Sequence, residues 1–89
     1  MSGKYIQGPT RKAGLLESHG AKLLGSSPPK SLSEIPAGKA LVVLADSGPF
    51  DACAWMFDDD ELKHWNDPDD YRLKSYWLLD TSTVMMLVK

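Results

Sequence analysis

The chain has only one cysteine and no long apolar run. Because Cys53 has no second cysteine to pair with, no disulfide can form within the chain, and small domains without disulfides are typical of the cytoplasm. The apolar run at residues 40–45 is far shorter than the roughly 20 residues that cross a bilayer. Residues 1–10 lack the apolar stretch of a secretory signal. We therefore expect a cytoplasmic protein that does not engage membranes.

The sequence also lacks the motifs that carry most enzyme chemistry. It contains no P-loop, no glycine-rich phosphate loop, no HExxH motif and no G-x-S-x-G elbow. Cys53 stands between two alanines, where a small buried side chain is expected, and the neighbouring Asp51 disfavours a thiolate. We therefore expect no catalytic residue, no metal and no cofactor.

A metal site or a small enzyme subunit is the alternative from a different class. Asp60 and His64 stand four residues apart, which places both on one face of a helix. Asp69 or Asp70 could fold back to join them, and Cys53 would complete the candidate set. Calcium loops need alternating carboxylates and a glycine, and zinc sites normally need more Cys or His than this chain offers. A solvated His64 is the favoured interpretation.

Negative charge is concentrated in one segment of the chain. Residues 51–70 carry a net charge of −7, whereas residues 1–50 carry +3 and residues 71–89 carry +2. Such an asymmetry concerns surface potential and partners rather than fold. The chain as a whole is not basic, so we expect no direct binding to nucleic acid.

The acidic run reads first as the start of a helix. Asp58 suits the N-cap, and Glu61 lies three residues later, the spacing of a capping box. Phe57 and Leu62 flank these positions with the spacing of a hydrophobic staple. The two aspartates between them fall in the first turn, where the helix dipole favours each by about 0.3–1 kcal/mol. Capping thus accounts for the whole run.

The same segment also has the composition of a recognition surface. Capping does not require Asp59 and Asp60, and it leaves Asp67, Asp69 and Asp70 unexplained. Seven carboxylates within residues 58–70 would repel nucleic acid and attract a basic protein surface. The two interpretations are compatible, because a capped helix can display its first turn.

Two aromatic residues are candidate anchors for such a surface. Trp65 falls at the end of the short helix, beside a turn, and we expect it to be exposed. Tyr76 shares its strand face with Arg72 and Lys74 and is the second candidate. Exposed aromatic residues ringed by charge are typical of interface hot spots. Burial in the core is the alternative for both.

The apolar pattern predicts one α+β domain at residues 10–89, preceded by a flexible arm at residues 1–9 in which Tyr5 and Ile6 could dock. We expect a mainly antiparallel sheet of four or five strands, with an N-terminal helix on one face and a short, acid-capped helix in a crossover. The expected elements are a helix at 10–19, an edge strand or helix extension at 21–24, one helical turn at 31–34, strands at 40–45, 50–57 and 71–80, and a terminal strand at 83–88. A helix capped by Asp80 is the alternative for the last segment.

These features together predict a small non-enzymatic binding protein. It would dock residues 58–70, with Trp65 as anchor, onto a basic surface of a partner protein. Small acidic domains without catalytic motifs are typical of the accessory and inhibitor proteins of phages and mobile elements. One alternative is a DNA mimic that blocks a nucleic-acid enzyme, although the positive charge outside residues 51–70 disfavours it. Another is a structural homodimer in which residues 83–88 pair as strands across a two-fold axis.

Overall fold

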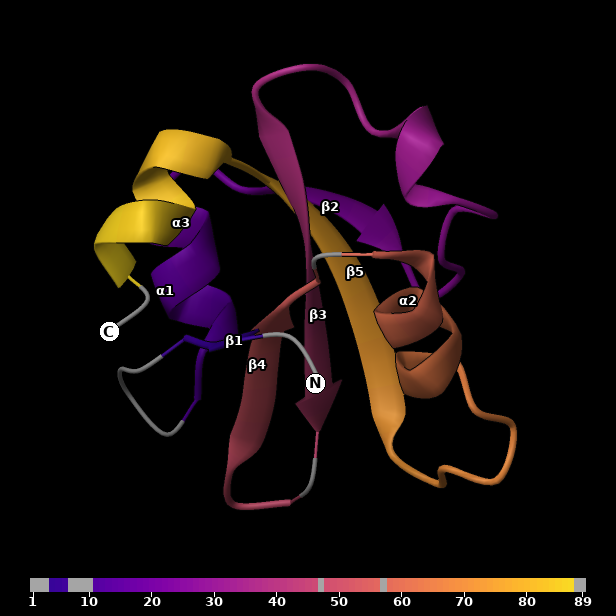
Figure 1. Ribbon diagram of the computed structural model, residues 1–89. Helices are drawn as coiled ribbons and strands as arrows, with labels where there is room; N and C mark the ends of the chain where they lie inside the picture. Colours follow the sequence, from indigo (N-terminus) through magenta and orange to yellow (C-terminus); the bar gives the residue numbers. More distant parts are fainter. Residues whose placement is uncertain (1–3, 7–10, 47, 57, 88–89) are drawn as a thin grey trace.

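A computed structural model describes residues 4–6, 11–46, 48–56 and 58–87. Within them the chain forms one five-stranded antiparallel sheet with the strand order β1-β4-β3-β5-β2 (Figure 1). The elements are β1 (Lys4–Tyr5), α1 (Ala13–Ser18), β2 (Lys22–Gly25), the short 3₁₀ helix η1 (Leu32–Glu34), β3 (Lys39–Asp46), β4 (Asp51–Trp55), α2 (Asp59–Trp65), β5 (Leu73–Asp80) and α3 (Thr81–Leu87). The predicted α+β architecture and strand number are confirmed.

The central strand β3 organises the sheet. It pairs antiparallel with β4 on one side and with β5 on the other, so β4 and β5 run parallel to each other. Helix α2 connects these two strands and is therefore the predicted crossover helix. Helices α1 and α3 lie on one face of the sheet, and α2 lies on the other (Figure 1). The two faces consequently carry separate clusters of buried side chains.

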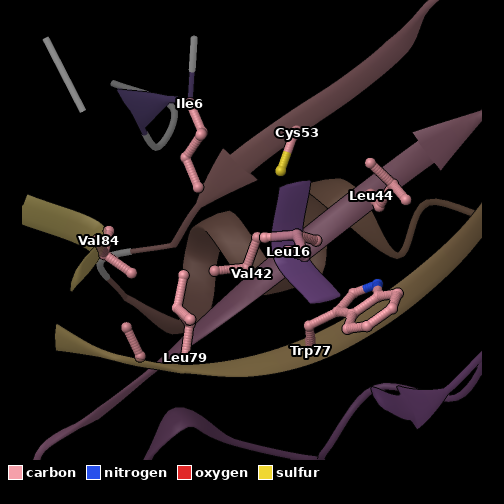
Figure 2. Packing of buried hydrophobic residues seen from close by; sticks show 9 residues of the cluster. Ile6, Leu16, Val42, Leu44, Cys53, Trp77, Leu79 and Val84 are labelled. Atoms are coloured by element: carbon pink, nitrogen blue, oxygen red, sulfur yellow. The ribbon is translucent and has the colours of Figure 1, made fainter. Parts of the chain in front are cut away.

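The cluster under α1 and α3 is cluster 1, and Figure 2 shows its side chains converging between these helices and the sheet. Its buried members are Ile6, Leu16, Ala40, Val42, Leu44, Cys53, Trp77, Leu79 and Val84. The cluster under α2 is cluster 2. Its buried members are Leu41, Val43, Ala45, Ala54, Met56, Leu62, Trp65 and Tyr76. Each face of the sheet therefore has its own core.

The run of apolar residues in β3 explains why both faces can be covered. Successive side chains of a strand point to opposite faces, and Val42 belongs to cluster 1 while Val43 belongs to cluster 2. Both valines are fully buried, and each contributes about 1.5–3 kcal/mol through burial. The alternation predicted in β5 is confirmed in the same way, with Trp77 facing cluster 1 and Tyr76 facing cluster 2.

The N-terminal part of the chain differs in extent from the predictions. Helix α1 spans only Ala13–Ser18, and Lys12 occupies its N-cap without a side-chain hydrogen bond; the predicted cap Thr10 lies outside the described residues. Gly20 ends the helix as expected, at φ +79°. The predicted alternatives at 21–24 are decided in favour of the edge strand β2, which pairs with β5.

Residues 4–6 of the predicted arm lie against the domain. Lys4–Tyr5 pairs with β4, and the N–H of Ile6 donates to the carbonyl of Cys53 at 2.8 Å. Ile6 is buried in cluster 1. The docking foreseen for Tyr5 and Ile6 is thus present, while residues 1–3 and 7–9 of the arm lie outside the described residues.

The predicted terminal strand at 83–88 is wrong, because Thr81–Leu87 forms the helix α3. Val84 and Leu87, three residues apart, both pack against cluster 1, whereas Met85 and Met86 are exposed. Helical spacing therefore outweighs the strand preference of the β-branched residues. The carboxylate of Asp80, the expected cap, binds the ammonium of Lys39 at 2.6 Å. The alternative of a homodimer required a strand at 83–88, and the chain forms the helix α3 at Thr81–Leu87 instead.

None of the helices in the described ranges has the length and apolar character needed to span a membrane.

Candidate functional site

Asp58 forms the predicted N-cap of α2. The Asp58 carboxylate accepts the backbone N–H of Glu61 at 2.9 Å. Leu62 is buried in cluster 2, as the inward face of the helix requires. Phe57, the other half of the predicted staple, lies outside the described residues. Asp58 therefore has a structural role, because its carboxylate caps the N-terminus of α2.

Asp59 has a structural role that the sequence did not reveal. Its Oδ1 accepts the backbone N–H of Leu32 at 2.7 Å, and both of its oxygens lie 3.2 Å from the Ser31 hydroxyl. Ser31 in turn accepts the N–H of Ser33 and so caps η1. The Asp59 carboxylate thus fastens η1 to the first turn of α2. The negative charge of Asp59 is therefore partly offset by hydrogen bonds from Ser31 and Leu32.

Asp70 is likewise bound within the domain. Its carboxylate accepts hydrogen bonds from Arg72 Nε at 3.0 Å and Nη2 at 2.7 Å, and Lys74 Nζ lies 3.2 Å away. These bonds from Arg72 hold the pKa of Asp70 well below its usual range. The guanidinium of Arg72 lies 5.3 Å from the centre of the Trp65 ring, in cation–π geometry. Asp70 therefore orders the loop before β5, and its charge is neutralised by two cations.

The expected exposure of Trp65 and Tyr76 is wrong, because both residues belong to cluster 2. Trp65 is 3% exposed and Tyr76 is 1% exposed. Trp65 lies three residues after Leu62 on the inward face of α2, and the Tyr5 ring meets it edge-on at 6.1 Å. Burial raises the pKa of Tyr76, and the charge of Asp70 adds to that rise. Neither aromatic ring is available as an exposed anchor.

The exposed aromatic residue next to the carboxylates is Tyr71. It is 92% exposed, and Leu73, two residues later, is 77% exposed. Asp67 and Asp69 precede them, and the Asp67 carboxylate accepts the N–H of Asp69 at 2.9 Å to shape the turn. We name Asp67, Asp69, Tyr71 and Leu73 the loop surface. It lies at the end of the sheet where β5 begins and β3 ends, since Leu73 pairs with Asp46.

Sequence reasoning missed Tyr71 and Leu73 because both fit the alternation of a half-buried strand. The dense turn formers just before Tyr71 were the available signal, since side chains beside a long turn often escape burial. Asp60, another of the predicted binding residues, is exposed on α2. The structure thus groups Asp67 and Asp69 with Tyr71 and leaves Asp60 apart.

The alternative metal or catalytic set is not assembled. The Cys53 side chain lies in cluster 1, whereas Asp60 and His64 project from α2 on the opposite side of the sheet. Burial raises the pKa of the Cys53 thiol to about 12, which makes it a poor nucleophile. Among the residues that the structure describes, no three Cys, His, Asp or Glu side chains gather as a metal site would require.

A second polar feature, unforeseen from the sequence, lies on the α1 face at the same end of the sheet. Asp46 and Asp51 face each other across β3 and β4, and Arg11 Nη1 lies 3.4 Å from Oδ1 of each. The backbone N–H of Lys12 donates to Asp51 Oδ2 at 3.2 Å. Asp51 therefore positions the start of α1, and Arg11 offsets the repulsion between the paired carboxylates.

No family model, curated protein or solved structure matches this chain. The fold and surface define an α+β domain with an acidic, apolar surface at one end of its sheet. Its function is argued from that surface.

Proposed function

We propose that this protein is a small non-enzymatic binding protein that docks its loop surface onto a basic surface of a partner protein. The observation that supports this proposal is the near-complete exposure of Tyr71, which lies between Asp69 and the exposed Leu73 in the sequence. An exposed tyrosine offers a large, rigid contact area at low entropic cost, which is why tyrosine is frequent at hot spots. Trp65 takes no part in the proposed contact, because its side chain is buried in cluster 2 between α2 and the sheet.

The charge of the loop surface specifies the partner's character. Asp67 and Asp69 are exposed, in contrast to Asp70, whose charge Arg72 and Lys74 neutralise. Exposed carboxylates around an apolar centre favour a partner surface rich in Lys or Arg, and they accelerate association at low salt. We expect binding to weaken as ionic strength rises, since such rim charges are screened.

The proposed partner is intracellular. The two buried clusters form without a disulfide, because the one cysteine, Cys53, is a buried free thiol. An accessory or inhibitor role, as in phages and mobile elements, is compatible with a small domain that exposes an acidic surface with apolar residues at its centre. The protein would act by covering a basic site on its target.

The test is affinity capture from a bacterial lysate at low and high salt with four tagged forms of the chain. The wild type is compared with Tyr71→Ala, Asp69→Lys and Asp60→Lys. The last two make the same charge change at exposed positions, one on the loop surface and one on α2. We expect a partner held by the wild type and by Asp60→Lys, and lost with Tyr71→Ala and Asp69→Lys. A partner retained by both loop variants would overturn the proposal.

A DNA mimic would need more unpaired carboxylates than this surface offers. Asp58 and Asp59 bind backbone N–H groups, and Asp70 is held by two cations. Competition by duplex DNA for the captured protein separates the two modes. Displacement by DNA without sensitivity to Tyr71→Ala would favour mimicry over docking.

A further inference from the structure

Strand β5 has an open edge next to the loop surface. Strand β3 pairs with β5 along its whole length, from Leu73 to Asp80. On the other side β2 covers β5 only in part, because its pairing stops where Gly25 meets Tyr76. Within the described residues, the stretch of β5 from Leu73 to Ser75 therefore has a neighbouring strand on one side only.

The hydrogen bonds of the sheet fix the direction in which the main chain of β5 points. The N–H of Thr81 donates to the carbonyl of Gly38 at 2.9 Å, which extends the β3–β5 ladder by one bonded pair. Bonded and non-bonded pairs alternate along an antiparallel ladder. Leu73 and Ser75 therefore also bond to β3, whereas Lys74 lies in a non-bonded pair. The N–H and C=O of Lys74 consequently point toward the open edge.

The other side of β3 agrees with this assignment. The N–H of Met56 donates to the carbonyl of Leu41 at 3.2 Å, so the odd-numbered residues of β3 bond to β4. The even-numbered residues are left to bond to β5, and Leu44 among them is the partner of Ser75.

Lys74 offers its main chain at this edge while its side chain is engaged elsewhere. Strand β2 ends at Gly25, where φ is +115°, and Ser26 no longer pairs with β5. In the described part of the chain, no loop residue bonds to the main chain of Lys74. The Lys74 side chain is 9% exposed, and its ammonium lies 3.2 Å from Asp70. Lys74 thus presents an N–H and a C=O, the groups with which a sheet edge pairs a further strand.

A groove opens at this edge of β5. It has a volume of about 590 Å³, and Ser26 and Lys74 both line it. Asp67 and Leu73, two members of the loop surface, line it as well. The volume lies within the range of ligand sites, about 300–1,000 Å³. The open edge is therefore continuous with the surface that we propose as the docking site.

We infer that this groove receives an extended segment of the partner protein, which continues the line of β2 and pairs with the main chain of Lys74. In strand addition the main chain of the ligand supplies the hydrogen bonds, and its alternate side chains supply the specificity. The exposed side chains of Tyr71 and Leu73 lie beside the groove and would contact the added segment. The inference rests on the proposed docking of the loop surface, and it specifies the conformation in which the partner binds.

The first test is hydrogen exchange of the main-chain amides in the ¹⁵N-labelled protein alone. We expect the Lys74 amide to exchange roughly tenfold faster, or more, than the Ser75 amide, which bonds to β3. Equal protection of the two amides would overturn the inference, because an N–H that already has a partner cannot receive a strand. Protection of Lys74 that rises with protein concentration would also overturn it, since a second copy of the chain would then cover the edge.

The second test adds a strand without the partner. The probe is the peptide N-acetyl-Lys-Val-Lys-Val-Lys-amide, and its control carries methyl groups on the three central main-chain nitrogens. The control keeps the side chains and the charge but loses the N–H groups. We expect saturable shifts and slower exchange at the Lys74 amide with the probe, and roughly tenfold weaker binding of the control. No saturable shift at Lys74, or equal binding of the two peptides, would contradict strand addition.

Two substitutions at Lys74 separate the main chain from the side chain. Lys74→Pro removes the N–H and Lys74→Ala keeps it, while both remove the ion pair with Asp70. Proline is compatible with a strand where the N–H faces away from its neighbour. We expect Lys74→Ala to bind the probe and Lys74→Pro to bind it roughly fivefold more weakly. Equal affinities would assign the contact to side chains and overturn the inference. If Lys74→Pro fails to fold, the methylated peptide still decides.

The strand test and the capture experiment fail independently. A protected Lys74 amide, or a peptide that binds equally well when methylated, leaves the docking of the loop surface in place through side chains alone. Loss of the docking proposal would instead show as capture insensitive to Tyr71→Ala and Asp69→Lys, whatever the edge of β5 binds.

Discussion

The carboxylate of Asp59 accepts the backbone N–H of Leu32 at 2.7 Å, across 27 residues of sequence. This bond turns one member of an acidic run into the link between α2 and η1. Asp60, the next residue, has no such contact with the described part of the chain. Two adjacent aspartates of the same helical turn therefore have different roles.

Replacement of Asp59 should destabilise the fold more than replacement of Asp60. We expect Asp59→Ala to lower the free energy of unfolding by about 1.5 kcal/mol, since it removes a cap for η1 and a favourable charge at the start of α2. Asp60→Ala removes only the charge, at about 0.5 kcal/mol. Urea unfolding of both variants measures the difference. Equal losses would show that the bond to Leu32 contributes nothing to stability.

Trp65 should behave as a core residue and Tyr71 as a surface residue. Trp65→Ala opens a cavity in cluster 2 and should cost about 3–5 kcal/mol, a large share of the stability of a small domain. Tyr71→Ala should change stability by no more than about 0.5 kcal/mol. Thermal unfolding followed by circular dichroism compares them. A stable Trp65→Ala variant that lost partner capture would restore Trp65 as a binding residue.

The ion pairs of Asp70 should stabilise the domain at neutral pH and not in strong acid. Because the folded pKa of Asp70 is lowered, its stabilisation is present above the unfolded value of about 3.9 and is lost as the pH falls through the folded value. The melting temperature of Asp70→Asn should therefore lie below that of the wild type at pH 7. The gap should narrow below about pH 4. A gap that stays constant down to pH 2.5 would contradict the assignment.

Cys53 should be unreactive in the folded protein. With a thiol pKa of about 12, its thiolate fraction at pH 8 is about a thousandfold smaller than that of an exposed cysteine. A colorimetric thiol reagent should label it slowly in buffer and rapidly in urea. Fast labelling without denaturant would mean that cluster 1 opens, or that the thiol has a chemical role.

The sequence predictions were correct where a feature depends on interactions between residues that are close together in the chain. The buried strand around Val42 and Val43, the cap at Asp58 and the helix stop at Gly20 each depend on a few neighbouring residues, and all three are present. The predicted strand at 83–88 failed because its β-branched residues had two compatible patterns. Packing of Val84, on the inward face of α3, into cluster 1 decided between them.

The candidate site was predictable only in part. Asp67 and Asp69 are exposed, but Trp65, the aromatic residue expected to be exposed beside them, is buried. Trp65 and Tyr71 are six residues apart, and no local pattern says which of them the sheet covers. The pairing of Asp46 with Asp51 follows from the β3–β4 register, whereas the position of Arg11 between them follows from the placement of α1.

The sequence by itself determined the class of fold, the central strand, the crossover helix and the concentration of negative charge in one segment. Those features follow from periodicity, capping and composition, which act over one or two turns of chain. The tertiary structure alone decided which carboxylates are bound inside the domain, which aromatic ring faces solvent, and that Arg11 lies between Asp46 and Asp51. These depend on contacts between segments distant in sequence, because burial and electrostatic pairing are properties of the packed whole.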